Sequence, residues 1–327
     1  MSRRWPLLIA FCLASVAGSR SETSSGVKLP VTYFDIRGSL ADRFDGKQIV
    51  LHGFRTGSSG LYFCVAPGPA ARNAAILKTD WNGIKEAVFT PAPDREILDF
   101  DVAERGDVYV LATEAHNNSS VLVYGPEGQL QSAMRLDHFS SSLCLVDGKP
   151  VLYLPDRATP RLEVLDAQGP TDINLPFRLT WPQSSITSLA GGRILLADKP
   201  SGVIYVVDLA FGRVSSFSAL PQDINPGSPP SPSHAVLRLF SLSNAATDPE
   251  GDVYVIAGRL RMTDGAPLSR FNSRGQLIET FRCALPTFES MKDPQNPGGY
   301  MVPNSVGLSG QLLFLVSGQG QVAAYAR

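Results

Sequence analysis

The chain has 327 residues, of which 43% are hydrophobic and 18% are charged, and its formal net charge is -1. This composition permits a large buried core, and the absence of a Lys and Arg cluster argues against a nucleic-acid partner. Beyond the first 20 residues, short apolar runs separated by Gly and Pro replace any helical period, so we expect an all-β fold.

The amino terminus has the features of a secretory signal peptide. Arg3 and Arg4 precede an apolar run over residues 6–17, and small residues follow it. The run is too short to span a bilayer, so we expect cleavage near the end of residues 1–19. The sequence therefore predicts a secreted or periplasmic protein without a transmembrane span after cleavage.

A motif in which a turn glycine precedes an apolar strand recurs six times along the chain. The copies read SSGLYFCVA, ERGDVYVLA, VDGKPVLYL, AGGRILLAD, PEGDVYVIA and LSGQLLFLV. Their glycines lie 42 to 46 residues apart in the first three intervals and 59 apart in the last two. A period near 44 is typical of one four-stranded propeller blade. The glycines are Gly60, Gly106, Gly148, Gly192, Gly251 and Gly310.

Two proline-rich stretches account for the longer intervals. They cover residues 221–234 and 286–303, and we expect both to be loops inserted between blades. A strand over residues 29–36 is left over near the start, whereas the last repeat holds three strands. Their pairing completes a six-bladed β-propeller and removes its open edge. The mature domain covers 20–327, with blades at 48–92, 97–136, 141–179, 186–220, 241–285, and 305–327 plus 29–36.

Residues Val102–Ala112 and Ala246–Ala257 resemble the repeat of six-bladed NHL-type propellers, within the TolB-like superfamily. In that family a turn glycine is followed by an apolar strand ending in Ala-Asp, as at Leu195–Asp198 here. The resemblance covers most of residues 30–327 and implies the fold. It does not specify an activity, because one propeller scaffold carries many.

The inner strand of each blade begins near one mouth of the channel, and residues about seven positions before each turn glycine should surround it. These positions are mainly polar, with His52 or Gly53 in the first repeat and Ser185 or Ile186 in the fourth. Convergent polar groups at such a mouth predict a ligand site, although they equally suit hydrogen bonds to neighbouring backbone. The predicted ligand-binding residues are His52, Asp99, Ser142, Asn244 and Asn304.

The resemblance also implies one enzymatic alternative, since six-bladed propellers include calcium-dependent gluconolactonases. In those enzymes carboxylate and amide oxygens hold the cation at the channel mouth. Asp99, Asn244 and Asn304 would be the metal ligands, although the family's ligands lie one residue further from the turn. The carboxylates closest to the family's early glutamate ligand are Asp42 and Asp45.

Other catalytic patterns are absent from the sequence. It contains no G-x-S-x-G elbow, its four histidines are scattered, and Cys64 and Cys144 lie in apolar strands typical of buried thiols. The sequence therefore predicts a monomeric, exported binding module that uses no cofactor. We expect it to bind a protein, glycan or small molecule through its channel mouth and proline-rich loops, with the calcium-dependent hydrolase as the alternative.

Overall fold

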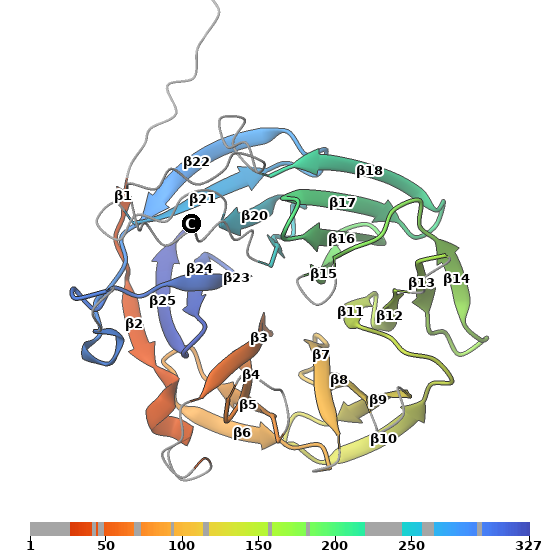
Figure 1. Ribbon diagram of the computed structural model, residues 1–327, viewed down its shortest axis with the longest axis horizontal. Helices are drawn as coiled ribbons and strands as arrows, with labels where there is room; N and C mark the ends of the chain where they lie inside the picture. The colour runs from red at the N-terminus through yellow and green to blue at the C-terminus, as the bar shows by residue number, and fades with distance from the viewer. Residues whose placement is uncertain are drawn as a thin grey trace, which may run out of the picture.

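Six sheets stand around a central channel in the computed structural model of this chain (Figure 1). Five sheets have four strands and one has five, which confirms the predicted six-bladed all-β propeller. The predicted signal peptide and the 221–234 insertion lie outside the described residues. The structure describes residues 27–40, 44, 49–68, 73–92, 95–113, 118–155, 159–180, 184–219, 244–256, 265–292 and 296–327.

Each blade is an antiparallel meander whose first strand faces the channel. Blade 1 consists of β3 (Val50–Thr56), β4 (Leu61–Ala66), β5 (Ala75–Thr79) and β6 (Lys85–Phe89), and blade 2 of β7 (Glu96–Val102), β8 (Val108–Thr113), β9 (Ser119–Tyr124) and β10 (Leu130–Arg135). Blade 3 consists of β11 (Ser142–Val146), β12 (Lys149–Leu154), β13 (Arg161–Val164) and β14 (Thr171–Asn174), and blade 4 of β15 (Ser184–Leu189), β16 (Arg193–Asp198), β17 (Val203–Asp208) and β18 (Arg213–Ser218). Blade 5 contains β19 (Ala246–Thr247), β20 (Val253–Ile256), β21 (Ala266–Phe271) and β22 (Leu277–Cys283), and blade 6 contains β23 (Pro303–Ser309), β24 (Leu312–Ser317) and β25 (Gln321–Ala326).

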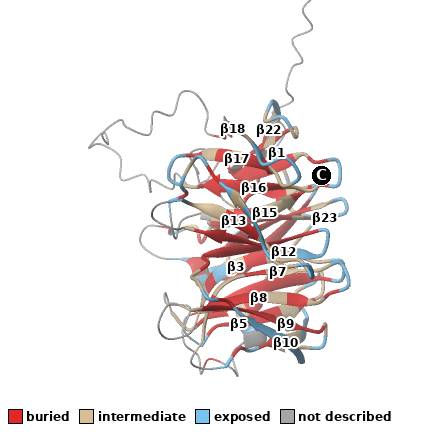
Figure 2. Cartoon of the chain, turned by 90° about the vertical axis from the view of Figure 1, so that its right-hand side faces the viewer, coloured by how far each residue is buried: buried red, intermediate tan, exposed pale blue. Residues whose placement is uncertain are grey.

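The repeated apolar motif forms the second strand of each blade. All six residues of β4 are buried, whereas all six of the outermost β10 are exposed. The motif's strand therefore lies between two neighbouring blades, where both of its faces meet side chains. Figure 2 shows the result, with buried residues along the strands and exposed ones concentrated at the turns.

The hydrophobic core is divided among the interfaces between blades. One cluster joins blades 1 and 2 through Tyr62, Phe100 and Val110, and another joins blades 5 and 6 through Tyr254 and Leu313. Burying one large apolar side chain contributes about 1.5–3 kcal/mol, so a single blade without neighbours would lose most of its stabilisation. Each blade therefore depends on its neighbours in the ring for much of its apolar burial.

An N-terminal strand closes that ring. β2 (Thr32–Asp35) pairs antiparallel with β25, with Thr32 opposite Ala324 and Asp35 opposite Gln321. This confirms the predicted closure, although the strand is shorter than 29–36 because η1 (Ile36–Leu40) follows it. The sequence did not predict β1 (Val27–Lys28), which adds a parallel fifth strand to blade 5 beside β22.

The second proline-rich insertion, residues 286–303, has structure of its own. Thr287 and Tyr300 form an isolated bridge, and the Asn296 side chain hydrogen-bonds both the backbone N–H and the carbonyl oxygen of Tyr300. Met301 is fully buried against blades 5 and 6. A short helical turn, η2 (Glu289–Met291), lies within it. The insertion therefore packs on the ring through Met301.

Candidate functional site

The channel has two mouths of different construction. At the strand-start mouth the inner strands β3, β7, β11, β15, β19 and β23 begin, and at the turn mouth they turn into the second strands. The predicted ligand residues lie on or beside inner strands, toward the strand-start mouth. Figure 1 shows these strands around the open centre of the ring.

Asp99 of β7 is hydrogen-bonded across two blade boundaries. Its Oδ2 accepts a hydrogen bond of 3.0 Å from the Leu143 N–H in β11, and its Oδ1 accepts one of 2.9 Å from the Arg55 guanidinium in β3. The N–H of Phe100 donates to the same Oδ1 at 2.9 Å. Both carboxylate oxygens are therefore already engaged in contacts that join blades 1, 2 and 3.

Asn244 holds blade 5 against blade 6 in the same way. Its Nδ2 donates to the Val306 carbonyl oxygen at 2.9 Å, and its Oδ1 accepts from the Val306 N–H at 2.9 Å. Side-chain hydroxyls make two further connections, from Thr247 to the Ser188 carbonyl at 2.9 Å and from Thr56 to the Leu308 carbonyl at 2.7 Å. The inner edges of the sheets, which lack a neighbouring strand, thus find partners in adjacent blades.

The other three predicted residues differ from these in exposure and contacts. His52 is exposed, with Nε2 at 3.2 Å from the Gly68 carbonyl oxygen, and Ser142 is buried within β11. Asn304 is exposed and accepts a hydrogen bond of 3.2 Å from the Ser305 hydroxyl.

The structure does not gather the five predicted residues into one cluster. Asp99 is hydrogen-bonded to Leu143, the residue after Ser142, and Asn244 is hydrogen-bonded to Val306, two residues after Asn304. Four of the predicted residues therefore form two pairs, Asp99 with Ser142 and Asn244 with Asn304. Those pairs belong to blades 2 and 3 and to blades 5 and 6, on opposite sides of the ring. His52 lies apart from both in blade 1.

Three inner strands each contain a one-residue irregularity in their pairing. Counting back from the turn glycine therefore does not give the position that a residue occupies in these strands. The register slips between Leu51 and Gly53 in β3, between Ile97 and Asp99 in β7, and between Pro303 and Ser305 in β23. Such a bulge turns the following side chain to a new direction. Spacing in the sequence cannot reveal these slips, because a bulge depends on how the strand pairs with its neighbour.

Sequence reasoning missed Arg55 and Asp101, which complete the charged centre of the channel. The Arg55 Nε lies 3.7 Å from Asp101 Oδ1, and the guanidinium stacks 5.5 Å from the Phe100 ring centre. Asp101 Oδ2 also accepts a 2.7 Å hydrogen bond from the Leu145 N–H. The alternation Asp99-x-Asp101 in an apolar strand was the available signal, since it places two carboxylates on one face.

Burial shifts the pKa values of the groups in this charged centre. It raises the pKa of Asp99 and of Asp101, although Arg55 and the backbone N–H donors act in the opposite direction. Lys199, directly after β16, interacts electrostatically with Arg55 and Asp99. Its pKa is lowered, mainly by burial and secondly by the charge of the Arg55 guanidinium. We call Arg55, Asp99, Asp101 and Lys199 the channel cluster.

A second hydrogen-bonded chain links Ser140, His138 and Glu163. His138 Nε2 lies 2.8 Å from Glu163 Oε2, and its Nδ1 lies 3.3 Å from the hydroxyl oxygen of Ser140. The order of groups is that of a hydrolytic triad. Ser140, however, is fully buried, so no substrate reaches its hydroxyl. The chain fastens the blade 2 to blade 3 connection onto β13.

The described residues provide neither a reactive thiol nor a group of three His, Cys, Asp or Glu side chains placed to hold a metal ion. Cys64, Cys144 and Cys283 are buried free thiols, and burial raises the pKa of Cys64 and of Cys283 to about 12. Asp99, Asn244 and Asn304 do not fit a calcium cage, because they come from blades 2, 5 and 6 and the first two have their oxygens engaged.

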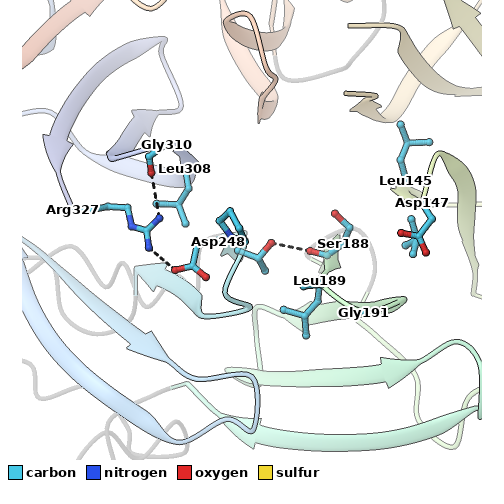
Figure 3. Close-up of a pocket in the computed structure, with 13 residues that line it drawn as sticks. Leu145, Asp147, Ser188, Leu189, Gly191, Asp248, Leu308, Gly310 and Arg327 are labelled. Carbon is cyan, nitrogen blue, oxygen red and sulfur yellow. Dashed lines mark hydrogen bonds and ion pairs between the residues drawn. The ribbon is translucent and has the colours of Figure 1, made fainter. Parts of the chain in front are cut away.

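A cavity of about 390 Å³ lies at the opposite end of the channel, at the turn mouth. Inner strands or turns of blades 3 to 6 line it, with apolar Leu145, Leu189 and Leu308 among the contributors (Figure 3). Arg327 also lines it, paired with the buried Asp248 carboxylate at 2.6 Å and donating to the Gly310 carbonyl at 3.3 Å. No pattern in the sequence indicates this cavity, because its residues come from four separate repeats.

Comparison with known proteins establishes the fold. The sequence matches no protein-family model and no curated protein. The WD40 domain of Neurospora crassa Pan2 is similar in structure, with a TM-score of 0.53 and 11% identity over 91% of this chain and 94% of that one. A streptogramin B lyase gives a TM-score of 0.51 and 12% identity over 90% and 86% of the two chains. Identities this low show a shared propeller fold and nothing about function.

Within the described part of the chain, no helix has the length and hydrophobicity needed to cross a bilayer.

Proposed function

We propose that this protein is an exported, monomeric binding module built on an NHL-type propeller, with no chemistry of its own. The observation that carries the proposal is the cavity of about 390 Å³ assembled at the turn mouth from four blades. Small-molecule pockets have volumes of about 300–1,000 Å³ and combine apolar walls with a few fixed polar groups. This cavity has both, in its leucines and in the Arg327–Asp248 pair.

The contacts of the inner strands support a binding role over a catalytic one. Asp99, Asn244 and Thr247 are hydrogen-bonded to neighbouring blades, so their polar atoms hold the ring together. A channel fixed in this way is preorganised for a ligand, which lowers the entropic cost of binding. As the second contact surface for a protein or glycan partner, we propose the strand-start mouth together with the two proline-rich insertions, 221–234 and 286–303, of which the first lies outside the described residues.

Export and the NHL assignment rest on the sequence. The Arg-Arg and apolar pattern of residues 1–19 supports a secreted or periplasmic location, and the turn-glycine repeats support the NHL type.

A ligand screen with matched variants tests the proposal. Thermal unfolding of the mature chain is measured against panels of glycans and small metabolites. The cavity is then filled by Ala190→Arg, with Ala133→Arg on the exposed β10 as the control. A ligand that binds the folded state raises stability by about 2.7 kcal/mol at a hundredfold excess over Kd. We expect hits that disappear in Ala190→Arg and remain in Ala133→Arg, whereas hits unaffected by both changes, or turnover of a panel compound, would refute the proposal.

A further inference from the structure

Asp147 stands on the wall of the turn-mouth cavity, in the hairpin that joins β11 to β12. Val146 pairs with Lys149 across this hairpin. The two residues between them, Asp147 and Gly148, have φ of 50° and 77°. Two positive φ values in a two-residue loop are typical of a type I′ turn, for which Asp-Gly is a preferred sequence. The turn therefore fixes the backbone from which the Asp147 carboxylate reaches the cavity.

The Asp147 carboxylate is open to a ligand. The residue is exposed, and within the described part of the chain its side chain accepts no hydrogen bond and forms no ion pair. Lys149 interacts with it electrostatically, but the Lys149 ammonium is hydrogen-bonded to the carboxylate of Asp166. Asp147 therefore has the hydrogen-bonding capacity of both oxygens available to a molecule in the cavity.

The arginines beside the cavity are already engaged with its wall. Arg327 pairs with Asp248 at 2.6 Å and lies 3.7 Å from Glu250. Arg193, at the start of β16, donates from Nε to the carbonyl oxygen of Ala190 at 3.1 Å. The charge of Arg327 is thus balanced by its own neighbouring carboxylates and does not neutralise Asp147.

The lining of the cavity carries a negative charge. Its ionisable residues are Asp147, Asp248 and Arg327, so two carboxylates face one guanidinium. The channel cluster adjoins the lining where Asp101 accepts a 2.7 Å hydrogen bond from the Leu145 N–H, but its two carboxylates and two cations add no net charge. A cation entering the cavity is therefore attracted, whereas an anion is repelled.

We propose that the turn-mouth cavity binds a primary amine with an apolar body. The ammonium pairs with Asp147, and the body lies against the leucines of the lining, Leu145, Leu189 and Leu308. Figure 3 shows Asp147 across the cavity from Arg327, so the ammonium is held on the side away from the guanidinium. A charge-assisted hydrogen bond of this kind is about twice as strong as a neutral one. This inference rests on the proposed function and names the chemical class of its ligand.

Three probes of similar shape and different charge test the site by isothermal titration calorimetry. They are phenethylamine, phenethyl alcohol and phenylacetate, which are cationic, neutral and anionic at pH 7. Asp147→Asn removes the charge and suits the same left-handed turn position, and Asp137→Asn, at a side chain that is 98% exposed, is the matched control. We expect the wild type and Asp137→Asn to bind the amine most tightly of the three probes. Asp147→Asn should bind it about tenfold more weakly and leave the affinity for the alcohol unchanged.

The wild type alone gives a second measurement. Binding through a charge should weaken as the ionic strength rises, for the amine and not for the alcohol. An amine affinity that is independent of salt, that is unchanged in Asp147→Asn, or that does not exceed the affinity for phenylacetate would overturn the inference. So would the absence of amine binding.

Ala190→Trp, which fills the cavity without adding a charge, separates this inference from the proposed function. If the alcohol or phenylacetate binds the wild type more tightly than the amine and is lost in Ala190→Trp, the cavity is a ligand site and only the preference for an amine fails. If amine binding persists in Ala190→Trp, the amine lies outside the cavity, and both the inference and the role given to the cavity are wrong.

Discussion

The Asp99 carboxylate accepts a hydrogen bond of 3.0 Å from the backbone N–H of Leu143, one blade further around the ring. Asp101 repeats the contact two residues later, at 2.7 Å from the Leu145 N–H. Two carboxylates on one strand therefore occupy the successive free N–H groups on the channel-facing edge of the next. Arg55 neutralises both from the opposite side, at 2.9 Å from Asp99 and 3.7 Å from Asp101.

Replacing Asp99 should weaken the ring substantially. Asp99→Ala leaves Arg55 buried without its closest counter-ion and leaves the Leu143 N–H unpaired. Breaking a buried ion pair from one side costs about 3–5 kcal/mol. Urea unfolding of the variant should show this loss, whereas Asp137→Ala, at a side chain that is 98% exposed, should stay within about 0.5 kcal/mol of the wild type. Equal stability of the two variants would contradict a structural role for Asp99.

Asn244 offers a sharper test of the contacts between blades. Asn244→Ala removes two hydrogen bonds to Val306 and should cost about 1–3 kcal/mol, because a buried donor and acceptor lose their partner. Asn244→Asp keeps the acceptor but places a carboxylate against the Val306 carbonyl oxygen, so it should not restore stability. Chemical denaturation at pH 7 measures both, and an aspartate variant as stable as the wild type would argue against the observed pairing.

Calcium should not stabilise the protein. The oxygens of Asp99 and Asn244 are already used in hydrogen bonds between blades, so binding a cation would break those bonds. We expect the Tm of residues 20–327 to be the same in EDTA and in added calcium. A calcium-dependent rise of several degrees that is missing in Asn304→Ala, whose side chain is exposed, would favour the lactonase-type alternative instead.

The turn glycines of the repeat should differ in their tolerance of substitution. A Cβ at Gly148 would meet no atom within 4 Å, so Gly148→Ala bears only the strain of a backbone φ of 77°, about 1–2 kcal/mol. A Cβ at Gly60 would overlap the carbonyl oxygen of Thr79 and force the β4–β5 pair apart. Differential scanning calorimetry should therefore place the Tm of Gly60→Ala below that of Gly148→Ala.

The lowered pKa of Lys199 predicts a pH dependence in the alkaline range. Between that lowered pKa and the ordinary value of 10.5, the unfolded chain holds more protons than the folded one. Stability contributed by this group therefore rises with pH across that window and is lowest below it. The free energy of unfolding of the wild type minus that of Lys199→Met should increase toward pH 10.5. A constant difference would show that Lys199 is not destabilised by burial.

The sequence by itself determined the architecture of this protein. Turn glycines such as Gly106 and Gly251, each before a run of apolar residues, specify one hairpin per repeat, and the leftover strand at Thr32–Asp35 specifies closure. These are local signals: the glycines adopt φ of 89° and 86°, which disfavours most other residues. The conformation of each turn depends on the few residues within it, so it can be predicted without the rest of the chain.

Only the tertiary structure decided what the polar residues of the channel do. The sequence placed Asp99 and Asn244 at one mouth, yet bulges in β7 and β23 and the docking of the next blade determine which backbone groups they meet. Arg55 meets Asp99 at 2.9 Å from the neighbouring blade, 44 positions away in the chain. Such contacts depend on the summed packing angles of all six blades, and no local pattern of residues encodes that sum.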